Sequence, residues 1–185
     1  MKRFNVIHKL IKDIPNPVGA EIGVCDGPFS EFLLKHNPSL KMYAIDPWVL
    51  YRKHYVGDTG AAQHGFSTQQ EFDDQYKAVK ARLARFGNRC IILRKTSIEA
   101  SKEIKDLSLD FVFIDANHLY SYVKQDILTY YSKVKKDGIV SGHDYNPKDE
   151  NHMINTCKAV NQIFYERELN TGSDSTWWVI KGQRK

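Results

Sequence analysis

The sequence predicts an α/β fold built on one doubly wound, mostly parallel sheet with an antiparallel C-terminal strand. Short apolar runs of strand length alternate along the chain with stretches whose apolar residues recur every three or four positions, which is typical of βα units. The chain has 185 residues, 42% hydrophobic and 26% charged, a composition that can bury a core without disulfides. We therefore expect a single Rossmann-like domain over 1–185.

Strands are predicted wherever a short apolar run is bounded by turn residues. The predicted strands are 18–24, 41–45, 90–93, 109–114, 138–141 and 176–180. After the last predicted helix we expect only one clear strand, which would pair antiparallel with the others.

Helices are predicted between these strands. Pro28 suits the first turn of a helix over 28–36, because the N–H that proline lacks has no partner there. The others are 68–86, 98–105, 119–134, 156–169 and a helix within the N-terminal segment 1–17 that covers one face of the sheet. Asp126 is expected to be a solvated or capping residue.

The connection over 47–67 is too long for an ordinary βα loop. It carries aromatic and basic residues, namely Trp48, Tyr51, Arg52, His54, Tyr55, His64 and Phe66. These residues suggest a lid over a substrate. The other interpretation is an ordinary surface loop.

A glycine turn follows the first predicted strand. Glu21, Gly23 and Gly27 form a Glu-x-Gly-x-x-x-Gly pattern just before Pro28. The dinucleotide pattern Gly-x-Gly-x-x-Gly, which an NAD(P)-dependent oxidoreductase would need, differs from it. Because Glu21 and Asp26 would repel a phosphate, the turn favours a cofactor without phosphates.

Two further segments lie where the same ligand could reach them. Asp46 ends the second predicted strand, where a carboxylate can accept hydrogen bonds from both ribose hydroxyls. Thr96 and Ser97 follow the third predicted strand, as a polar contact or as an ordinary helix N-cap. We expect no complete capping box with Glu99.

These residues resemble the class I S-adenosylmethionine-dependent methyltransferases. The resemblance implies that the glycine turn wraps the methionine and ribose end of the cofactor and that an acid after the second strand holds the ribose. The residues that it places around S-adenosylmethionine are Glu21, Gly23, Gly27, Asp46, Trp48, Thr96, Ser97 and Asp115, with Trp48 and the Thr96–Ser97 pair near the adenine.

A second polar cluster is predicted after the fourth and fifth strands. Asp115 and His118 follow one strand, and His143 and Asp144 follow the other. If the two strands are neighbours, these four side chains meet at the carboxyl edge of the sheet. They would form either a divalent-metal site or a base beside carboxylates that deprotonates a hydroxyl.

The patterns around this cluster resemble one subgroup, the macrocin and rhamnosyl O-methyltransferases and the cephalosporin hydroxylase-like proteins. The resemblance implies methylation of a hydroxyl on a small, sugar-like or natural-product-like acceptor, with Mg²⁺ held by three acids. Here Asp115, His143 and Asp144 take those positions, and the imidazole would favour a softer divalent cation than Mg²⁺.

The net charge of +5 suggests polyanion binding, but it is segregated along the chain. The segments 18–51 and 96–150, which hold every motif above, are net negative, and the basic region 77–95 is more simply the solvated face of a helix. A nucleic-acid-binding or nucleic-acid-modifying protein is therefore the less favoured alternative. Three distant cysteines and the absence of a signal-peptide core or a membrane-spanning run predict a cytoplasmic protein. We expect the substrate site to be completed by loops or by a second subunit of a homodimer.

Overall fold

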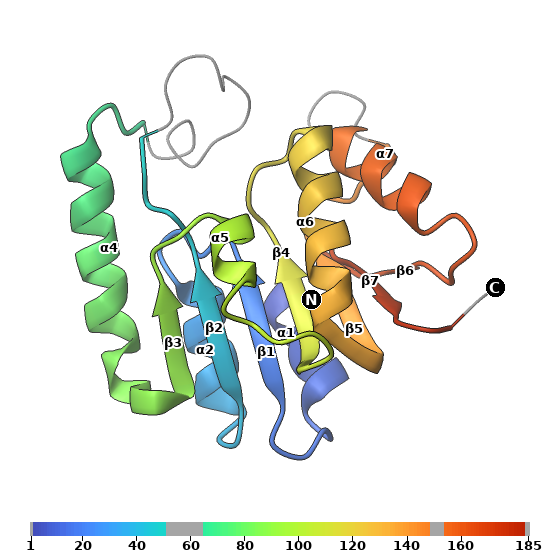
Figure 1. Cartoon of the computed structure of the whole chain (residues 1–185), viewed down its shortest axis with the longest axis horizontal. Helices are drawn as coiled ribbons and strands as arrows, with labels where there is room; N and C mark the ends of the chain where they lie inside the picture. Colours follow the sequence, from blue (N-terminus) through green and yellow to red (C-terminus); the bar gives the residue numbers. More distant parts are fainter. Residues whose placement is uncertain (1, 51–64, 149–153, 184–185) are drawn as a thin grey trace.

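The computed structural model describes residues 2–50, 65–148 and 154–183, and its strands form one seven-stranded sheet (Figure 1). The sheet order is β3-β2-β1-β4-β5-β7-β6. The strands are β1 (Val18–Ile22), β2 (Lys41–Ile45), β3 (Cys90–Leu93), β4 (Leu109–Ile114), β5 (Val134–Gly142), β6 (Asn170–Thr171) and β7 (Trp177–Ile180). Pairing is parallel from β3 through β5 and antiparallel between β5 and β7. The predicted fold class is confirmed.

Four strands differ from the prediction: β1 ends two residues early, β7 begins one residue late, and β5 and β6 differ more. The two-residue β6 was not expected, because Asn170 and Thr171 carry no apolar pattern; it forms by pairing antiparallel with Trp177 and Trp178. Strand β5 begins at Val134, four residues before the predicted apolar run, because the buried Val134 already pairs with Leu109 of β4.

Helices cover both faces of the sheet (Figure 1). They are α1 (Arg3–Ile11), α2 (Pro28–His36), α4 (Gln69–Leu83) with the 3₁₀ turn η2 (Ala84–Arg89), α5 (Ser97–Ser101), α6 (Tyr120–Lys133) and α7 (Ile154–Ile163). Residues of α1, α2 and α4 share one buried cluster, and residues of α5, α6 and α7 share the other. Residues 51–64, most of the predicted lid, lie outside the described residues.

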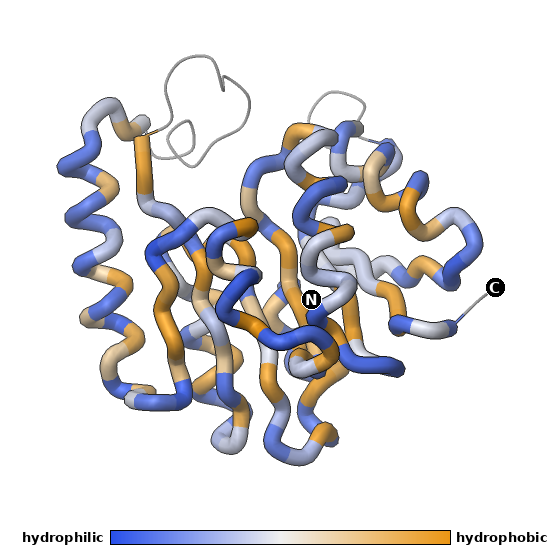
Figure 2. Tube along the Cα trace, in the orientation of Figure 1, coloured by the Kyte–Doolittle hydropathy of each residue, from blue (hydrophilic) through white to orange (hydrophobic). Residues whose placement is uncertain are grey.

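The local sequence explains where these helices begin. Pro28 is the first residue of α2 and follows Gly27, which has the left-handed φ of 78°. Helix α4 starts at a capping box formed by Thr68 and Glu71. Figure 2 shows that α4 is largely hydrophilic while the strands beside it are hydrophobic, as expected for helices on the outside of a buried parallel sheet.

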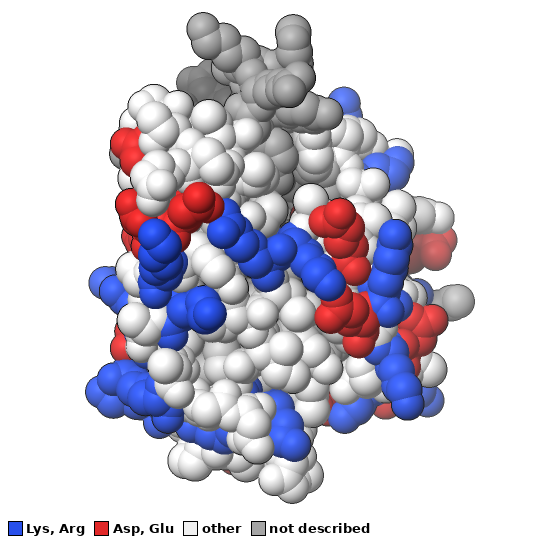
Figure 3. Space-filling model, turned by 60° about the vertical axis from the view of Figure 1, so that its left-hand side comes forward, with Lys and Arg blue, Asp and Glu red and all other residues white. Residues whose placement is uncertain are grey.

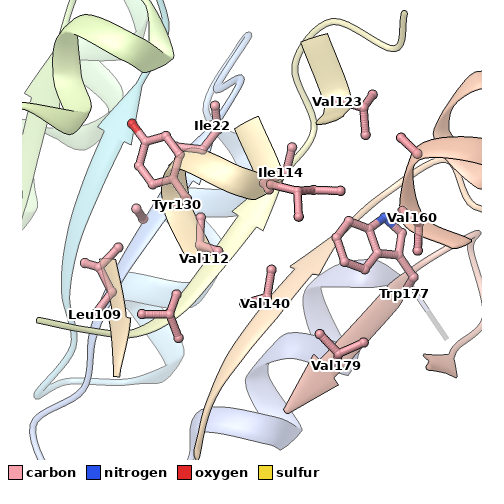
Figure 4. Close-up of a cluster of buried hydrophobic side chains, with 14 of the residues drawn as sticks. Ile22, Leu109, Val112, Ile114, Val123, Tyr130, Val140, Val160, Trp177 and Val179 are labelled. Atoms are coloured by element: carbon pink, nitrogen blue, oxygen red, sulfur yellow. The ribbon is translucent and has the colours of Figure 1, made fainter. Parts of the chain in front are cut away.

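The core is split by the sheet because strand side chains alternate between its faces. On the face drawn in Figure 4, Val112 and Ile114 of β4 lie with Tyr130 of α6 and Trp177 of β7. Phe111 and Phe113 of the same strand belong to the cluster on the opposite face. The sheet is therefore buried on both sides, which leaves its carboxyl edge for a binding site.

That edge contains the point at which the strand order reverses. β1 lies between β2 and β4, so the loops that leave β1 and β4 separate there and open a crevice. β4 and β5 are neighbours, as the site prediction required, and the N–H of His143 donates to Ile114 O at 3.1 Å. Among the described residues, no helix is long and apolar enough to cross a membrane.

Candidate functional site

A cavity of about 730 Å³ lies at the carboxyl edge of the sheet. Its wall includes nine of the residues predicted from sequence: Glu21, Gly23, Asp46, Thr96, Ser97, Asp115, His118, His143 and Asp144. Gly27 and Trp48 are not among the lining residues. Residues from α4 and α6 complete the wall, including Gln75 and Asp126.

Gly23 allows the turn after β1 to approach the end of β4. Its φ is +90°, and a Cβ atom there would lie 2.2 Å from the carbonyl oxygen of Asp115. Gly27 has a different role: a Cβ there would meet Val79 of α4 at 3.4 Å, so this glycine shapes the start of α2 behind the cavity wall. Both glycines therefore have a backbone reason, and only Gly23 borders the cavity.

Asp46 fixes the glycine turn. Its Oδ2 accepts hydrogen bonds from the N–H groups of Val24 and Cys25, each at 3.0 Å, and its Oδ1 accepts one from Trp48 N at 2.8 Å. Burial raises the pKa of the Asp46 carboxyl, although the three N–H groups oppose the rise. A carboxylate with two lone pairs on each oxygen still has capacity for a ligand hydroxyl in the cavity.

Glu21 is a second buried acid in the wall. It is 3% exposed, and its carboxylate accepts a hydrogen bond from the hydroxyl of Ser30 on α2. Burial raises the pKa of Glu21 well above its ordinary value. A buried carboxyl group facing a cavity is suited to a ligand that brings its own donors or positive charge.

Trp48 lies in the core. Its side chain is 1% exposed, its Nε1 donates to the carbonyl oxygen of Cys25 at 3.1 Å, and its ring centroid is 5.0 Å from that of Tyr76. The structure therefore does not bring Trp48 into the cavity, and the neighbouring Pro47 and Val49 line it instead. From sequence, a large aromatic ring beside a strand end suggests stacking on a ligand. Here the ring instead packs between α4 and the glycine turn.

Thr96 is a complete helix N-cap, which corrects our expectation for the capping box. The Glu99 N–H donates to Thr96 Oγ1 at 3.3 Å, and the Thr96 N–H donates to Glu99 Oε2 at 3.1 Å. Both Thr96 and Ser97 still line the cavity.

Asp126 was missed as a site residue. It is 4% exposed, lines the cavity, and accepts a hydrogen bond from the hydroxyl of Ser97. Burial raises the pKa of Asp126 to about 6, although the Ser97 bond opposes the rise. Its place on α6, one turn after Val123 and beside Ile127, was the available signal: an acid next to two core positions faces inward.

The second polar cluster forms as predicted. His118 Nε2 lies 2.9 Å from Asp144 Oδ2 and 3.5 Å from Asp115 Oδ1. His143 Nδ1 lies 3.0 Å from Asp144 Oδ1 and 3.8 Å from Asp115 Oδ1. The non-glycine residue Asp144 has a φ of 56°, a strained conformation that turns its carboxylate toward both rings.

The charges of this cluster are coupled. Burial disfavours the charged imidazole, but the carboxylates of Asp115 and Asp144 outweigh it and raise the pKa of His118. Burial likewise opposes ionisation of Asp144, but hydrogen bonds from His118 and His143 outweigh it and lower the pKa of Asp144. The carboxylates therefore favour the charged form of His118, and the two imidazoles favour the charged form of Asp144.

The grouping best suited to a cation differs from the predicted one. Ligand atoms of Asp115, His118 and Asp144 all lie within 4.8 Å of one another, and this is the only such group among the residues that the structure describes. His118 thus takes the position that we expected for His143. His143 instead lies toward α1, where its Nε2 is 3.1 Å from Arg3 Nη1.

Arg3 is another cavity-lining residue that the sequence did not indicate. Its guanidinium lines the cavity, with Nη2 at 3.7 Å from Asp115 Oδ2. Nothing in the local sequence of α1 connects Arg3 to a strand end more than a hundred residues away, and only the packing of α1 brings the two together.

Known proteins resemble this chain in sequence or in fold. The curated relative "Uncharacterized protein y4gI" of Sinorhizobium fredii (strain NBRC 101917 / NGR234) is 27% identical over 127 residues, which is 69% of this chain but only 12% of the relative's length. The solved O-methyltransferase NovP has a TM-score of 0.70 at 15% identity, over 98% of this chain and 80% of its own. CalS11, titled a TDP-rhamnose 3'-O-methyltransferase, has a TM-score of 0.64 at 15% identity, over 97% and 78%.

At such identities the solved structures show the fold alone. The family comparison goes further, because a model described as a methyltransferase domain matches residues 20–145. That match begins in β1, ends just after Asp144, and so includes the glycine turn, Asp46 and the second polar cluster. It spans more than half of the chain, which therefore belongs to the methyltransferase domain family.

Proposed function

We propose that the protein transfers a methyl group from S-adenosylmethionine to a hydroxyl group of a small molecule. The observation that carries this proposal is the position of Asp115. Its backbone borders Gly23 of the glycine turn, and its side chain belongs to the cluster with His118 and Asp144. A cofactor held by the turn would therefore present its reactive end to that cluster.

The order of the strands gives the cofactor a direction. Suppose that Asp46 at the end of β2 holds the ribose and that the reaction takes place at the ends of β4 and β5. The adenine of the cofactor then extends in the opposite direction, toward β3. Thr96, Ser97 and Asp126 line the cavity on that side. The buried acids Glu21 and Asp46 favour a cationic sulfonium cofactor over one with phosphates.

The acceptor would lie at the second polar cluster. Methyl transfer from a sulfonium needs the acceptor oxygen in line with the methyl group, so the protein must orient the hydroxyl, exclude water and take up its proton. Asp115 and Asp144 can each accept a hydrogen bond from that hydroxyl and so orient its oxygen toward the methyl group. The name of CalS11 supports a sugar-like acceptor.

A divalent cation is the second element of the proposal. Asp115, His118 and Asp144 offer two carboxylate oxygens and one imidazole nitrogen within the spacing of a metal site. This mixed set favours Mn²⁺ or Zn²⁺ over Mg²⁺, which prefers oxygen ligands. Such a cation would lower the pKa of an acceptor hydroxyl bound to it.

The surface gives less support to a nucleic-acid function. On the face that includes α4, Lys and Arg lie beside Asp and Glu (Figure 3). Arg82 and Arg85 both pair with Glu31, and Arg94 pairs with Asp73. Ion pairs within the protein reduce the positive charge that phosphate binding would need.

Isothermal titration calorimetry tests the cofactor assignment. We expect S-adenosylmethionine and S-adenosylhomocysteine to bind and NADH not to bind; binding of NADH alone would contradict the proposal. The acceptor class is then tested with S-adenosylmethionine labelled on its methyl group and a panel of nucleotide sugars, catechols and oligonucleotides. Label transferred only to an oligonucleotide would reject the small-molecule acceptor.

A further inference from the structure

The positively charged side chain of Arg3 contacts the second polar cluster, although Arg3 itself lies on α1 and not at the carboxyl edge of the sheet. Arg3 is the first residue of α1, on the opposite side of the sheet from α6. Its Nη1 lies 3.1 Å from His143 Nε2, and its Nη2 lies 3.7 Å from Asp115 Oδ2. Arg3 and Asp115 are 29% and 17% exposed, so water screens this pair only in part.

Arg3 is held here by a hydrogen-bond contact with His143 and by the charge of Asp115, but not by all of its donors. The Nε atom of Arg3 is buried and has no hydrogen-bond partner in the described part of the chain. A buried unpaired donor destabilises the arrangement. The backbone N–H of Arg3 donates to Asp174 Oδ2 at 3.1 Å, which ties the start of α1 to the turn before β7. The side chain therefore lies against Asp115 even though its Nε donor is left without a hydrogen-bond partner among the described residues.

Asp115 is also one of the three residues that offer ligands to a cation. A divalent ion on Asp115 and a guanidinium within a few ångströms of the same carboxylate would repel each other in a half-buried site. The two positive charges therefore compete for one carboxylate.

We propose that Arg3 determines whether a divalent cation binds at Asp115, His118 and Asp144. The guanidinium is a resident positive charge beside Asp115, and its removal raises the affinity for the cation. This inference rests on the proposed function, because the cation has a role only if the cluster activates the acceptor. Arg3 is a residue that sets the cation affinity, not a catalytic residue.

Titration with Mn²⁺, followed by the electron paramagnetic resonance signal of free Mn²⁺, tests the inference on the whole metal-free chain. Arg3→Met removes the charge and keeps an apolar stem. Lys9→Met is the matched control, because Lys9 is an exposed cation on the same helix and does not line the cavity. Arg3→Lys retains a positive charge and distinguishes charge from the shape of the guanidinium.

We expect Arg3→Met to bind Mn²⁺ about tenfold more tightly than the wild type, or more. Lys9→Met should stay within about twofold of the wild type, and Arg3→Lys should remain closer to the wild type than to Arg3→Met. Adding Asp115→Asn to Arg3→Met should abolish the gain. Thermal melts of each variant check that it is folded.

Equal or weaker Mn²⁺ binding by folded Arg3→Met overturns the inference, and so does a gain that survives Asp115→Asn or a failure of every variant to bind Mn²⁺. Titration of the same proteins with S-adenosylhomocysteine separates this failure from failure of the proposed function. If the nucleoside binds while Mn²⁺ binding does not respond to Arg3, the cofactor assignment stands and only the role of Arg3 falls.

Discussion

The hydroxyl of Ser97 donates a hydrogen bond to the buried carboxyl group of Asp126 and so joins the start of α5 to the middle of α6. Tyr130 of α6 also contacts Ser97, because its hydroxyl donates to Ser97 O at 2.8 Å. Two residues of α6 one turn apart thus clamp the residue that follows Thr96 in the cavity wall. Because Asp126 is buried and its pKa is raised to about 6, this clamp depends on pH.

The first prediction concerns that dependence. A carboxyl whose pKa is raised in the folded state stabilises the fold below its unfolded pKa of 3.8 and loses this contribution as the pH rises through about 6. Asp126→Asn cannot ionise at this position. We therefore expect its free energy of unfolding to rise relative to that of the wild type, by up to about 3 kcal/mol, as the pH increases from 4 to 7. Urea unfolding at both pH values measures this, and parallel behaviour of the two proteins would contradict it. Asp13→Asn, at a side chain 87% exposed, should show no such trend.

The second prediction compares two glycines with a positive φ, one with a crowded Cβ position and one with an open Cβ position. Ala at Gly23 would have both a positive φ and a Cβ 2.2 Å from Asp115 O, whereas Gly87 has a φ of +55° with nothing within 4 Å of its Cβ position. Gly87 also has a ψ of −133°, a backbone conformation that strongly favours glycine. We therefore expect Gly87→Ala to lose about 1–3 kcal/mol and Gly23→Ala to lose clearly more than that, or to fail to fold. Chemical denaturation compares them, and equal losses would mean that β1 and β4 can move apart.

The third prediction tests the ribose assignment at Asp46. Asp46→Asn replaces an acceptor of N–H groups by a side chain that is half donor, so it should lose about 1–3 kcal/mol of stability and at least about tenfold in affinity for S-adenosylhomocysteine. Asp110→Asn is the control, because Asp110 also accepts a backbone N–H, from Val18 at 2.8 Å, but does not line the cavity. It should lose stability without losing cofactor affinity. Unchanged affinity in folded Asp46→Asn would remove Asp46 from the ribose site.

The sequence predicted the parts of the site that depend on chain order. Asp46 and Asp115 follow a strand directly, and Asp144 is the second residue after one. The carboxyl ends of parallel strands always meet at one edge, so their convergence required only that the strands be recognised. The strands β2, β3 and β4 were identified with their observed bounds, because each is a short apolar run bounded by turn or polar residues.

The parts that depend on packing between distant elements were not predictable. Arg3 reaches Asp115 only because α1 packs beside α2 on one face, and no local pattern records that contact. Trp48 stands in a segment that looks like a lid, yet its ring fills the space beside Tyr76. Its φ of 42°, set in part by the hydrogen bond from its own N–H to Asp46, turns it inward, and such a backbone conformation has no signature in a tryptophan.

The last prediction decides what Thr96 does, using two helices that begin alike. Thr96 and Thr68 each form a complete capping box, with Glu99 and Glu71 respectively, but only Thr96 lines the cavity. The Thr96 hydroxyl already donates to Glu99 Oε2 at 2.7 Å and accepts from Glu99 N, so little of it remains for a ligand. We expect Thr96→Ala and Thr68→Ala to lose a similar amount of stability, about 1 kcal/mol each.

Both variants should also bind S-adenosylhomocysteine within about threefold of the wild type, while Ser97→Ala should bind it more weakly because the carboxyl group of Asp126 loses its donor. Thermal melts and calorimetric titrations of the three variants measure both quantities. A loss of affinity of about tenfold confined to Thr96→Ala would mean that the threonine hydroxyl leaves its cap to contact the cofactor. Equal losses of affinity in Thr96→Ala and Thr68→Ala would instead result from a general loss of stability, since Thr68 does not line the cavity.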